Sequence, residues 1–269
     1  MSRARGAAFG IGTFLLTLIA LGFLVLPIVA IFARVPLHRL FAQLDDPIVL
    51  DALELTATTN AIALAVILVV GTPAAYFLGT RRFRGRTVAI TLIELPLVLP
   101  PTVAGIGLLS DILDPIGVSV VFTTTAVVVA ICFVAGPFYL RQAIAAFETL
   151  DADILDAARV DGAGPLRVLV SVSIPLAKSG LAAGAALAFA RGVGEFGATI
   201  MFAGNLRGVT QTLPLLIYQD FELSFDVALA ISALLVVVSA ALLITVKLVV
   251  RVPGKARGAA LVLTAPGRR

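Results

Sequence analysis

The chain has 269 residues, of which 60% are hydrophobic and only 13% charged, and its formal net charge is +4. Soluble globular proteins carry about 25% charged residues, so this composition indicates a polytopic membrane protein. The single cysteine, Cys132, and the single histidine, His38, exclude an internal disulfide framework and leave no basis for a Cys- or His-rich metal site or a His-based triad.

Six apolar stretches are long enough to cross a hydrocarbon core, which requires about 20 residues of helix. The runs are too long and too continuously apolar for membrane strands. We therefore expect an all-α membrane protein in which residues 1–269 form a single transmembrane domain, with no separate soluble core. The predicted spans are Phe9–Phe32, Leu55–Leu78, Thr87–Leu109, Val118–Leu140, Leu181–Ala203 and Val227–Val250.

The basic residues predict the orientation of these spans. With the N-terminus in the cytoplasm, sixteen of the twenty Lys and Arg residues fall in cytoplasmic segments and three in external ones, and the last, Arg191, falls within a span. This asymmetry predicts that both termini are cytoplasmic. The first span is longer than a signal-peptide core, so we expect an uncleaved helix. We expect a disordered basic tail at about 252–269, and an external surface position rather than a ligand role for His38.

The third span contains the phrase LPLVLPPTVAG, from Leu95 to Gly105. Its prolines, Pro96, Pro100 and Pro101, each remove a backbone donor and disturb the helix. Broken helices at membrane depth lie inside protein or line a cavity. From the residues alone, a kinked packing helix and a pathway wall remain equally open. Glu94, just before this phrase, is expected to pair or to face the bundle interior.

A polar stretch between the fourth and fifth spans, residues 150–176, predicts a short helix at its start. Asp151 or Asp153 can cap this helix, because a carboxylate accepts hydrogen bonds from the free amides of the first turn. A narrow apolar face is expected at Ile154, Leu155 and Ala158, which recur at helical spacing.

The second half of this stretch predicts a glycine turn and a second short helix. Gly162 and Gly164 are expected to end the first helix, because glycine tolerates the left-handed conformation. Pro165 suits the first turn of the second helix, and Pro175 is expected to mark the entry to the fifth span. The alternative is an ordinary loop packed on its own bundle.

The fifth span carries two opposite charges. Arg191 is expected near the bilayer middle, with Glu195 one turn further on the same face. A structural ion pair, or one that holds a gate shut, is favoured over direct anion contact by Arg191. The glycines Gly192, Gly194 and Gly197 match a dinucleotide-binding spacing but lack a preceding strand, and they are interpreted as close helix contacts.

The polar stretch resembles the EAA loop of ATP-binding-cassette importer permeases. The pattern of that loop is matched by Asp156-Ala157-Ala158, by Gly162 after three residues, and by Val172-x-Ile174-Pro175 after nine more. The resemblance implies a type I importer permease fold and a loop that docks an ATPase. The residues that it assigns to this coupling are Leu155, Asp156, Ala157, Ala158, Asp161, Gly162 and Pro175.

The phrases LPLVLPPTVAG and GEFGATIMFAGN resemble the molybdate and tungstate permeases more than the sulfate permeases of the oxyanion-importer branch. This implies a molybdate or tungstate importer, with a sulfate or thiosulfate permease as the alternative. Thr102 is then expected to offer a hydroxyl to a passing oxyanion. The candidates for the pathway or its gate are Pro100, Pro101, Thr102, Arg191, Glu195 and Asn205.

The resemblance also implies the partners of the chain. No P-loop occurs, since Gly254-Lys255 is followed by Ala256, so ATP and Mg²⁺ are expected on a separate subunit, and no catalytic residue, metal or cofactor is expected here. The implied assembly is a homodimer with two ATPase subunits and an extracytoplasmic oxyanion-binding protein, in the lipid bilayer of a bacterial inner membrane, without nucleic acid. An ion-coupled secondary transporter is the other class considered; it predicts inverted repeats, which the chain does not show.

Overall fold

The computed structural model describes residues 2–36, 41–109 and 120–249, and no β-strand occurs among them. By length and composition, five of the described helical runs could cross a membrane, and the bent pair α4–α5 passes the same test when its two helices are taken together. The expected tail at about 252–269 and His38 lie outside the described residues. The helical elements are α1 (Ser2–Arg34), η1 (Gln43–Asp45), α3 (Pro47–Thr80), α4 (Arg86–Val98), α5 (Pro101–Leu109), α6 (Thr124–Glu148), α7 (Ala152–Val160), α8 (Pro165–Val168), η3 (Leu169–Ser173), α9 (Ile174–Val193), α10 (Gly197–Phe202), α11 (Leu213–Leu223) and α12 (Phe225–Val249).

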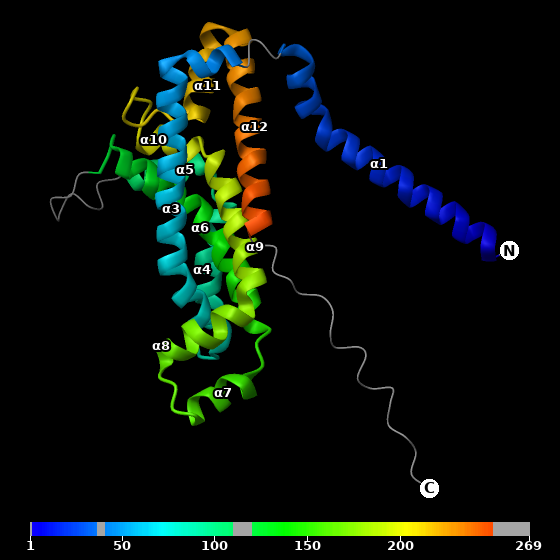
Figure 1. The fold of residues 1–269 in the computed structure, drawn as a ribbon, viewed down its shortest axis with the longest axis vertical. Helices are drawn as coiled ribbons and strands as arrows, with labels where there is room; N and C mark the ends of the chain where they lie inside the picture. Colours follow the sequence, from blue (N-terminus) through cyan, green and yellow to red (C-terminus); the bar gives the residue numbers. More distant parts are fainter. Residues whose placement is uncertain (1, 37–40, 110–119, 250–269) are drawn as a thin grey trace.

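Helix α6 forms the centre of the bundle and packs against α3 and α9 (Figure 1). Its buried face includes four alanines and Gly136, and such small residues let the neighbouring backbones approach closely. Tyr139 on α6 is 1% exposed, and a Cβ added at Gly71 on α3 or at Gly184 on α9 would come within 3.2 Å of its ring. The glycines on both sides therefore make room for the largest buried side chain of the core.

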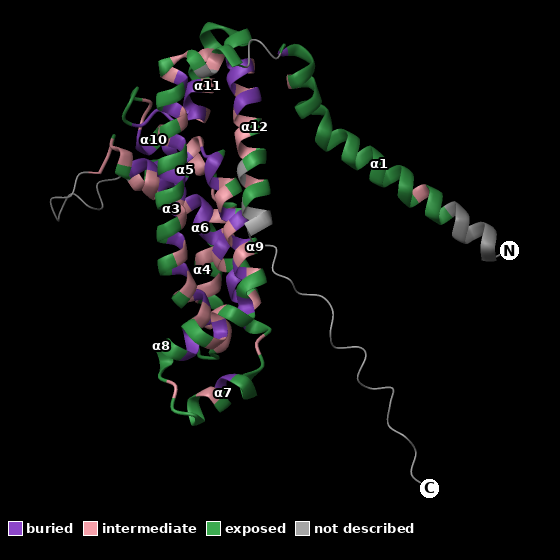
Figure 2. Ribbon diagram, in the orientation of Figure 1, coloured by how far each residue is buried: buried purple, intermediate pink, exposed green. Residues whose placement is uncertain are grey.

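Helix α1 runs away from the bundle along most of its length (Figures 1 and 2). None of its membrane-span window is buried in the chain. Only its last turn and the residue after it contact the bundle, where Ile31 and Val35 pack against Ala230 and Ala233 of α12. The predicted first, second and sixth spans are confirmed as helices, although the second helix, α3, begins at Pro47, where Asp46 caps it.

The third predicted span is broken, as its prolines indicate. The chain bends by 108° between α4 and α5. Leu99 and Pro100 lie between them, and Pro101 begins α5, where a missing N–H costs no helical hydrogen bond. Pro96 lies inside α4 without ending it.

The predicted bounds of the fourth and fifth spans were wrong. The fourth helix, α6, runs from Thr124 to Glu148 instead of Val118–Leu140. The fifth apolar helix runs from Pro165 to Val193, through α8, η3 and α9, and does not reach Ala203. Polar residues such as Arg167 and Lys178 lower the hydropathy of its first turns but do not prevent helix, so the hydropathy signal begins too late.

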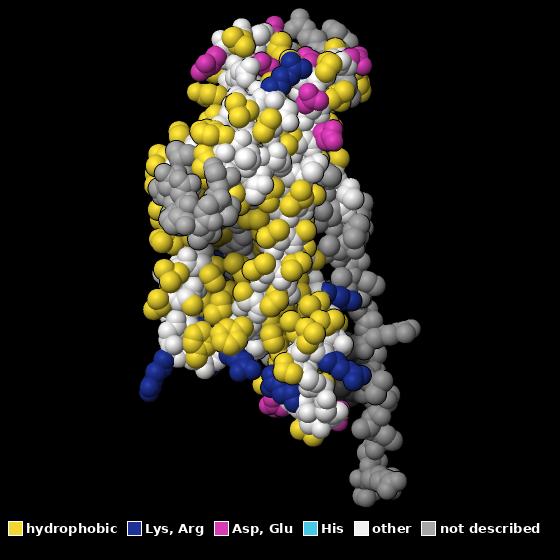
Figure 3. All heavy atoms as spheres, turned by 90° about the vertical axis from the view of Figure 1, so that its left-hand side faces the viewer, with side chains coloured by type: hydrophobic (Ala, Val, Ile, Leu, Met, Phe, Trp, Pro, Cys, Tyr) yellow, Lys and Arg dark blue, Asp and Glu magenta, His cyan; other side chains and the backbone are white. Residues whose placement is uncertain are grey.

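The charges separate between the two ends of the bundle (Figure 3). Lys and Arg side chains gather at the end with α7 and α8, where some Asp and Glu side chains also lie, and Asp and Glu side chains predominate at the opposite end with α11. This distribution matches the predicted orientation, with the α7 end cytoplasmic and the α11 end external.

Candidate functional site

Helix α7 lies at the cytoplasmic end of the bundle, and short segments connect it to α6 and to α8 (Figure 1). Asp151 caps it, because its Oδ1 accepts a hydrogen bond from the Asp153 N–H at 2.9 Å. The predicted apolar face is confirmed at Leu155, which is 4% exposed, and is wrong at Ile154, which is 47% exposed. A single buried leucine therefore anchors α7 and leaves most of its surface open.

The glycine turn after α7 is confirmed at Gly162, whose φ is +84°. A Cβ at this position would meet no neighbouring atom, so only the backbone conformation requires glycine. Gly164 has φ −66° and is the N-cap of α8, so the expected left-handed conformation was wrong there. Pro165 occupies the first turn of α8, as expected.

The second short helix does not end before the fifth span. From Pro165 the chain continues through a π-helical turn, Leu169–Ser173, in which the Ser173 hydroxyl donates to the Val168 carbonyl at 3.1 Å. Pro175 lies in the first turn of α9, as expected for a proline that marks a helix start, but the helical run of the fifth span already begins at Pro165. No loop therefore separates α8 from α9.

The cytoplasmic surface of this unit combines small, apolar and charged side chains. Val160 is 87% exposed and Leu166 is 73% exposed, while Asp156 and Arg159 form an exposed ion pair. Asp156 raises the pKa of the Arg159 guanidinium. An open groove of about 520 Å³ lies along the α8 side, lined by Gly164, Pro165, Leu166, Arg167, Val170 and Ser171. A face of this kind suits a soluble protein partner, and its coupling role stays a prediction.

A second group of candidate residues meets at the break between α9 and α10. Arg191 Nη1 lies 2.7 Å from Glu195 Oε2, which confirms the expected ion pair. Glu195 lies beyond the end of α9, so the pair is not formed along a continuous helix, and Arg191 lies in the last turn of α9 rather than at the middle of a span. The second carboxylate oxygen, Oε1, accepts from the Ala198 N–H at 2.8 Å, so Glu195 also satisfies a free amide of α10.

Helix α5 packs tightly on α10. A Cβ at Gly105 would lie 2.7 Å from the Ala198 carbonyl oxygen, and one at Gly197 would lie 3.1 Å from Pro101 and 3.4 Å from Thr102. Pro101 and Thr102, two of the predicted pathway residues, thus lie beside the start of α10, and Pro100 is exposed just before them.

The other glycines of the GxGxxG pattern differ from each other. Gly192 is a close contact, since a Cβ there would lie 2.4 Å from Asn60 Oδ1. Gly194 has open space around it, so its interpretation as a helix contact was wrong.

Asn205 lies apart from these residues, in the loop before α11. Its Nδ2 donates to Gln219 Oε1 at 3.2 Å, and Gln211 Nε2 donates to the same oxygen at 2.7 Å. Asn205 Oδ1 is buried without a hydrogen-bond partner. The sequence gives no sign of either glutamine contact, because the spacing of Gln211 and Gln219 does not link them to Asn205.

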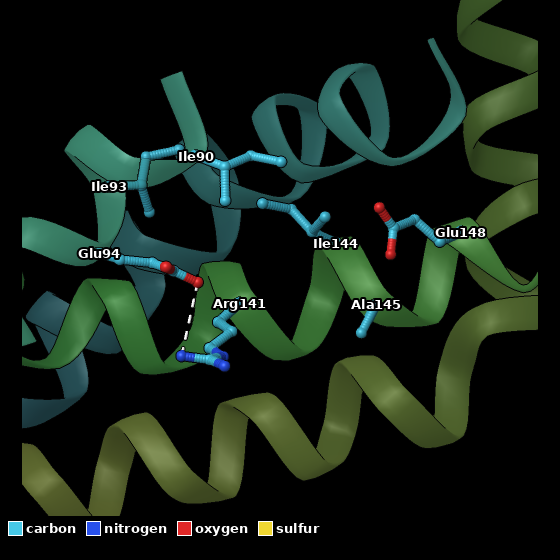
Figure 4. A pocket seen from close by; sticks show the side chains of 7 residues that line it. All are labelled: Ile90, Ile93, Glu94, Arg141, Ile144, Ala145 and Glu148. Atoms are coloured by element: carbon cyan, nitrogen blue, oxygen red, sulfur yellow. Dashed lines mark ion pairs between the residues drawn. The ribbon is translucent and has the colours of Figure 1, made fainter. Parts of the chain in front are cut away.

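A cavity of about 190 Å³ lies between α4 and α6 in the cytoplasmic half of the bundle (Figure 4). Glu94 Oε1 and Arg141 Nη1 face each other across it at 3.5 Å, which confirms that Glu94 pairs. Glu148, nearer the end of α6, pairs with Arg86. From the sequence, Arg141 is assigned only to the cytoplasmic charge excess, and nothing in its spacing from Glu94 indicates this pair. Within the described part of the chain, no group of three His, Cys, Asp or Glu residues is arranged to hold a metal.

Comparisons with known proteins agree with this geometry. Residues 71–252 match the family described as binding-protein-dependent transport system inner membrane component. The chain is 42% identical over 229 residues to the molybdenum transport system permease protein ModB of Mycobacterium tuberculosis, covering 81% of this chain and 86% of that protein. It is 34% identical over 203 residues to sulfate permease 2, chloroplastic, of Chlamydomonas reinhardtii, covering 70% and 55%. A bacterial alginate ABC transporter, solved with an alginate-bound periplasmic protein, shares the fold with a TM-score of 0.69 at 17% identity, covering 90% of this chain and 93% of that one.

Proposed function

Since the chain belongs to the family of binding-protein-dependent transport system inner membrane components, we propose that it is the membrane-spanning subunit of an ATP-driven importer of molybdate, or of the closely similar tungstate. The 42% identity to a molybdenum permease over most of both chains carries the assignment of substrate. Sulfate is the second candidate, because a sulfate permease is also related, at 34% identity.

In this proposal the α7 unit couples the permease to an ATPase. Leu155 anchors the unit, and Asp156, Ala157, Ala158, Asp161 and Gly162 form or border its cytoplasmic surface. Closure of two ATPase subunits on ATP and Mg²⁺ moves α7, and α8 passes that movement to α9, because the helix between Pro165 and Val193 is unbroken. Pro175 acts inside this helix. The chain itself carries out no covalent chemistry.

A second copy of the chain completes the pathway. None of the residues of α4 is buried, and its apolar side chains Val88, Leu92 and Val98 are 61–82% exposed. The same helix carries Glu94, which a lipid-facing helix tolerates poorly. A two-fold dimer through α4 and α5 removes this exposure and places Pro100, Pro101 and Thr102 beside the pathway.

The external end receives a binding protein that releases the oxyanion. Carboxylates dominate this end, so a free dianion is repelled there and delivery by a carrier is favoured. Alternating access then moves the anion past the α9–α10 break. Arg191 is already neutralised by Glu195, and Asn205 and its glutamines shape the outer loop.

Uptake of labelled molybdate tests the substrate. Cells that lack this gene are compared with cells that carry it, with unlabelled tungstate and sulfate as competitors. The proposal expects uptake to require the gene, tungstate to compete and sulfate to be inert. Loss of sulfate uptake with unchanged molybdate uptake would establish the sulfate alternative.

Copurification tests the coupling unit. Gly162→Trp adds bulk at a left-handed position and is expected to release the ATPase from the solubilised complex. Gly162→Asn is the matched control, since asparagine tolerates this conformation, and it should retain the ATPase. Equal ATPase recovery with both variants would remove Gly162 from the interface, and proton-driven transport without any ATPase would refute the importer.

A further inference from the structure

We propose that the cavity between α4 and α6 is a transient binding site for the transported tetrahedral oxyanion, in which Arg141 exchanges between Glu94 and the anion. The inference rests on the proposed function, and it assigns a role to a cavity in the cytoplasmic half of the bundle. The cavity residues are Ile90, Ile93, Glu94, Arg141, Ile144, Ala145 and Glu148 (Figure 4).

The position of these charges requires water or protein around them. The side chain of Arg141 is 66% exposed in the isolated chain and that of Glu94 is 36% exposed, although both lie within membrane-span helices. Each of the two residues lies about 10–12 Å along the helix axis from the cytoplasmic end of its helix. Ionisable side chains at such positions face a bundle interior or a water-filled cavity rather than lipid. The α4–α6 face that carries them is therefore part of an internal surface.

Arg141 is the one cation among the described residues that line this cavity. Arg86, which pairs with the cavity residue Glu148, is committed there, and its Nε donates to the Leu78 carbonyl at 2.7 Å. Arg141 has only the 3.5 Å contact with Glu94, which is longer than a hydrogen bond. Its donors are thus available to a second acceptor.

The geometry and the electrostatics fit a tetrahedral oxyanion. A guanidinium presents paired N–H donors that match two oxygens of one anion. The cavity volume of about 190 Å³ far exceeds the roughly 10–15 Å³ that one water needs by the same measure, so a four-oxygen anion enters with part of its hydration shell. Ile90 and Ile93 on α4 and Ile144 on α6 complete the lining with apolar side chains, which offer no acceptor that competes with the anion for Arg141.

Glu94 gives the site its low affinity. A dianion must displace Glu94 to reach Arg141, and it is repelled by Glu94 and Glu148 while it is bound. When the anion leaves, Glu94 pairs with Arg141 again and satisfies the exposed charge. A transport pathway requires this kind of exchange, because a tightly held substrate would not be released.

Occupancy of the cavity can be measured directly by protection of a cysteine. Ala145 is exposed on α6 and lines the cavity, so Ala145→Cys in a Cys132→Ala background places one thiol beside Arg141. The complete nucleotide-free complex with its ATPase is treated with N-ethylmaleimide in molybdate or in chloride at matched ionic strength. The same preparation is reconstituted to measure molybdate uptake.

Molybdate is expected to slow the labelling of Cys at position 145 in a concentration-dependent way. Arg141→Gln should raise the half-protecting concentration about tenfold or more, as expected for the loss of a charged hydrogen bond. Glu94→Gln should lower it, because the competitor is removed. Arg82→Gln, which removes an exposed cytoplasmic arginine outside the cavity, is the matched control and should leave protection unchanged.

Three results would overturn the site. The first is a thiol at position 145 that fails to react, which would mean that the α4–α6 face is sealed from solvent. The second is a thiol that reacts equally fast with and without molybdate. The third is an Arg141→Gln variant that molybdate protects as well as it protects the parent. Any of these, together with normal molybdate uptake, refutes the cavity site alone. Absent molybdate uptake in the parent complex refutes the proposed function instead.

Discussion

The ion pair at the α9–α10 break predicts an asymmetric response to removing its two charges. Glu195 is buried, with a side chain 1% exposed, whereas the Arg191 side chain is 28% exposed. Arg191→Met leaves a buried carboxylate with one hydrogen bond, from the Ala198 N–H. Removing one partner of a buried pair costs about 3–5 kcal/mol of unfolding free energy.

The opposite substitution should cost much less. Glu195→Gln keeps an oxygen that accepts from the Ala198 N–H, and it leaves behind an arginine that reaches solvent. The expected loss is about 1 kcal/mol, the scale of one hydrogen bond in a partly exposed setting. The double variant Arg191→Met with Glu195→Gln buries no unpaired charge and should recover most of the loss caused by Arg191→Met.

Unfolding in mixed micelles of mild detergent and sodium dodecyl sulfate, followed by far-ultraviolet circular dichroism, gives the three free energies. The predicted order of stability is Glu195→Gln, then the double variant close to it, then Arg191→Met. An Arg191→Met variant as stable as Glu195→Gln would show that the burial of Glu195 carries no electrostatic cost, and would refute the reasoning.

Two further substitutions test packing and surface charge. Gly180→Val is expected to destabilise the bundle by about 1–3 kcal/mol or more, because a Cβ at Gly180 would lie 2.4 Å from the Cβ of Ala146. Gly194→Val is the control, because a Cβ at Gly194 would meet open space. Equal losses of unfolding free energy in the two variants would contradict the packing argument. Burial, and to a lesser extent the charge of Asp46, raises the pKa of the Asp220 carboxyl above its ordinary value of 3.8. The folded state therefore binds the carboxyl proton more tightly than the unfolded state does. The unfolding free energy that this difference contributes is lost as the pH rises through the raised pKa. Asp220→Asn should therefore unfold at higher denaturant than the parent near neutral pH but not below pH 3.8, and a pH-independent difference would contradict this.

The sequence predicted those features whose cause is local. The broken third span follows from Pro100 and Pro101, which end and begin helices by removing backbone donors. The left-handed turn at Gly162 follows from the pattern around it. The ion pair of Arg191 with Glu195 follows from a separation of four residues, although the helix ends between them.

The features that the sequence did not predict depend on tertiary contacts. Arg141 and Glu94 are 47 residues apart on two helices, and only the packing of α4 on α6 brings them together. The continuous helix through Pro175 depends on a π-helical turn that hydropathy does not register. The end of α9 at Val193 depends on Glu195, whose side chain bonds the backbone of α10 and fixes the break.

Two arginines inside the membrane-span helices, Arg141 and Arg191, share one arrangement, and it bears on how an anion passes. Arg191 pairs with Glu195, and Arg141 pairs with Glu94. Each arginine is thus neutralised by the chain itself, which lowers the cost of placing it in the bundle. The two pairs differ in strength, because the first is a 2.7 Å contact with a buried carboxylate and the second a 3.5 Å contact between exposed groups. In an oxyanion importer, the Arg191–Glu195 pair holds the broken helix together, and the Arg141–Glu94 pair releases its arginine to the substrate. The bundle thus stabilises its own charges without binding a dianion tightly.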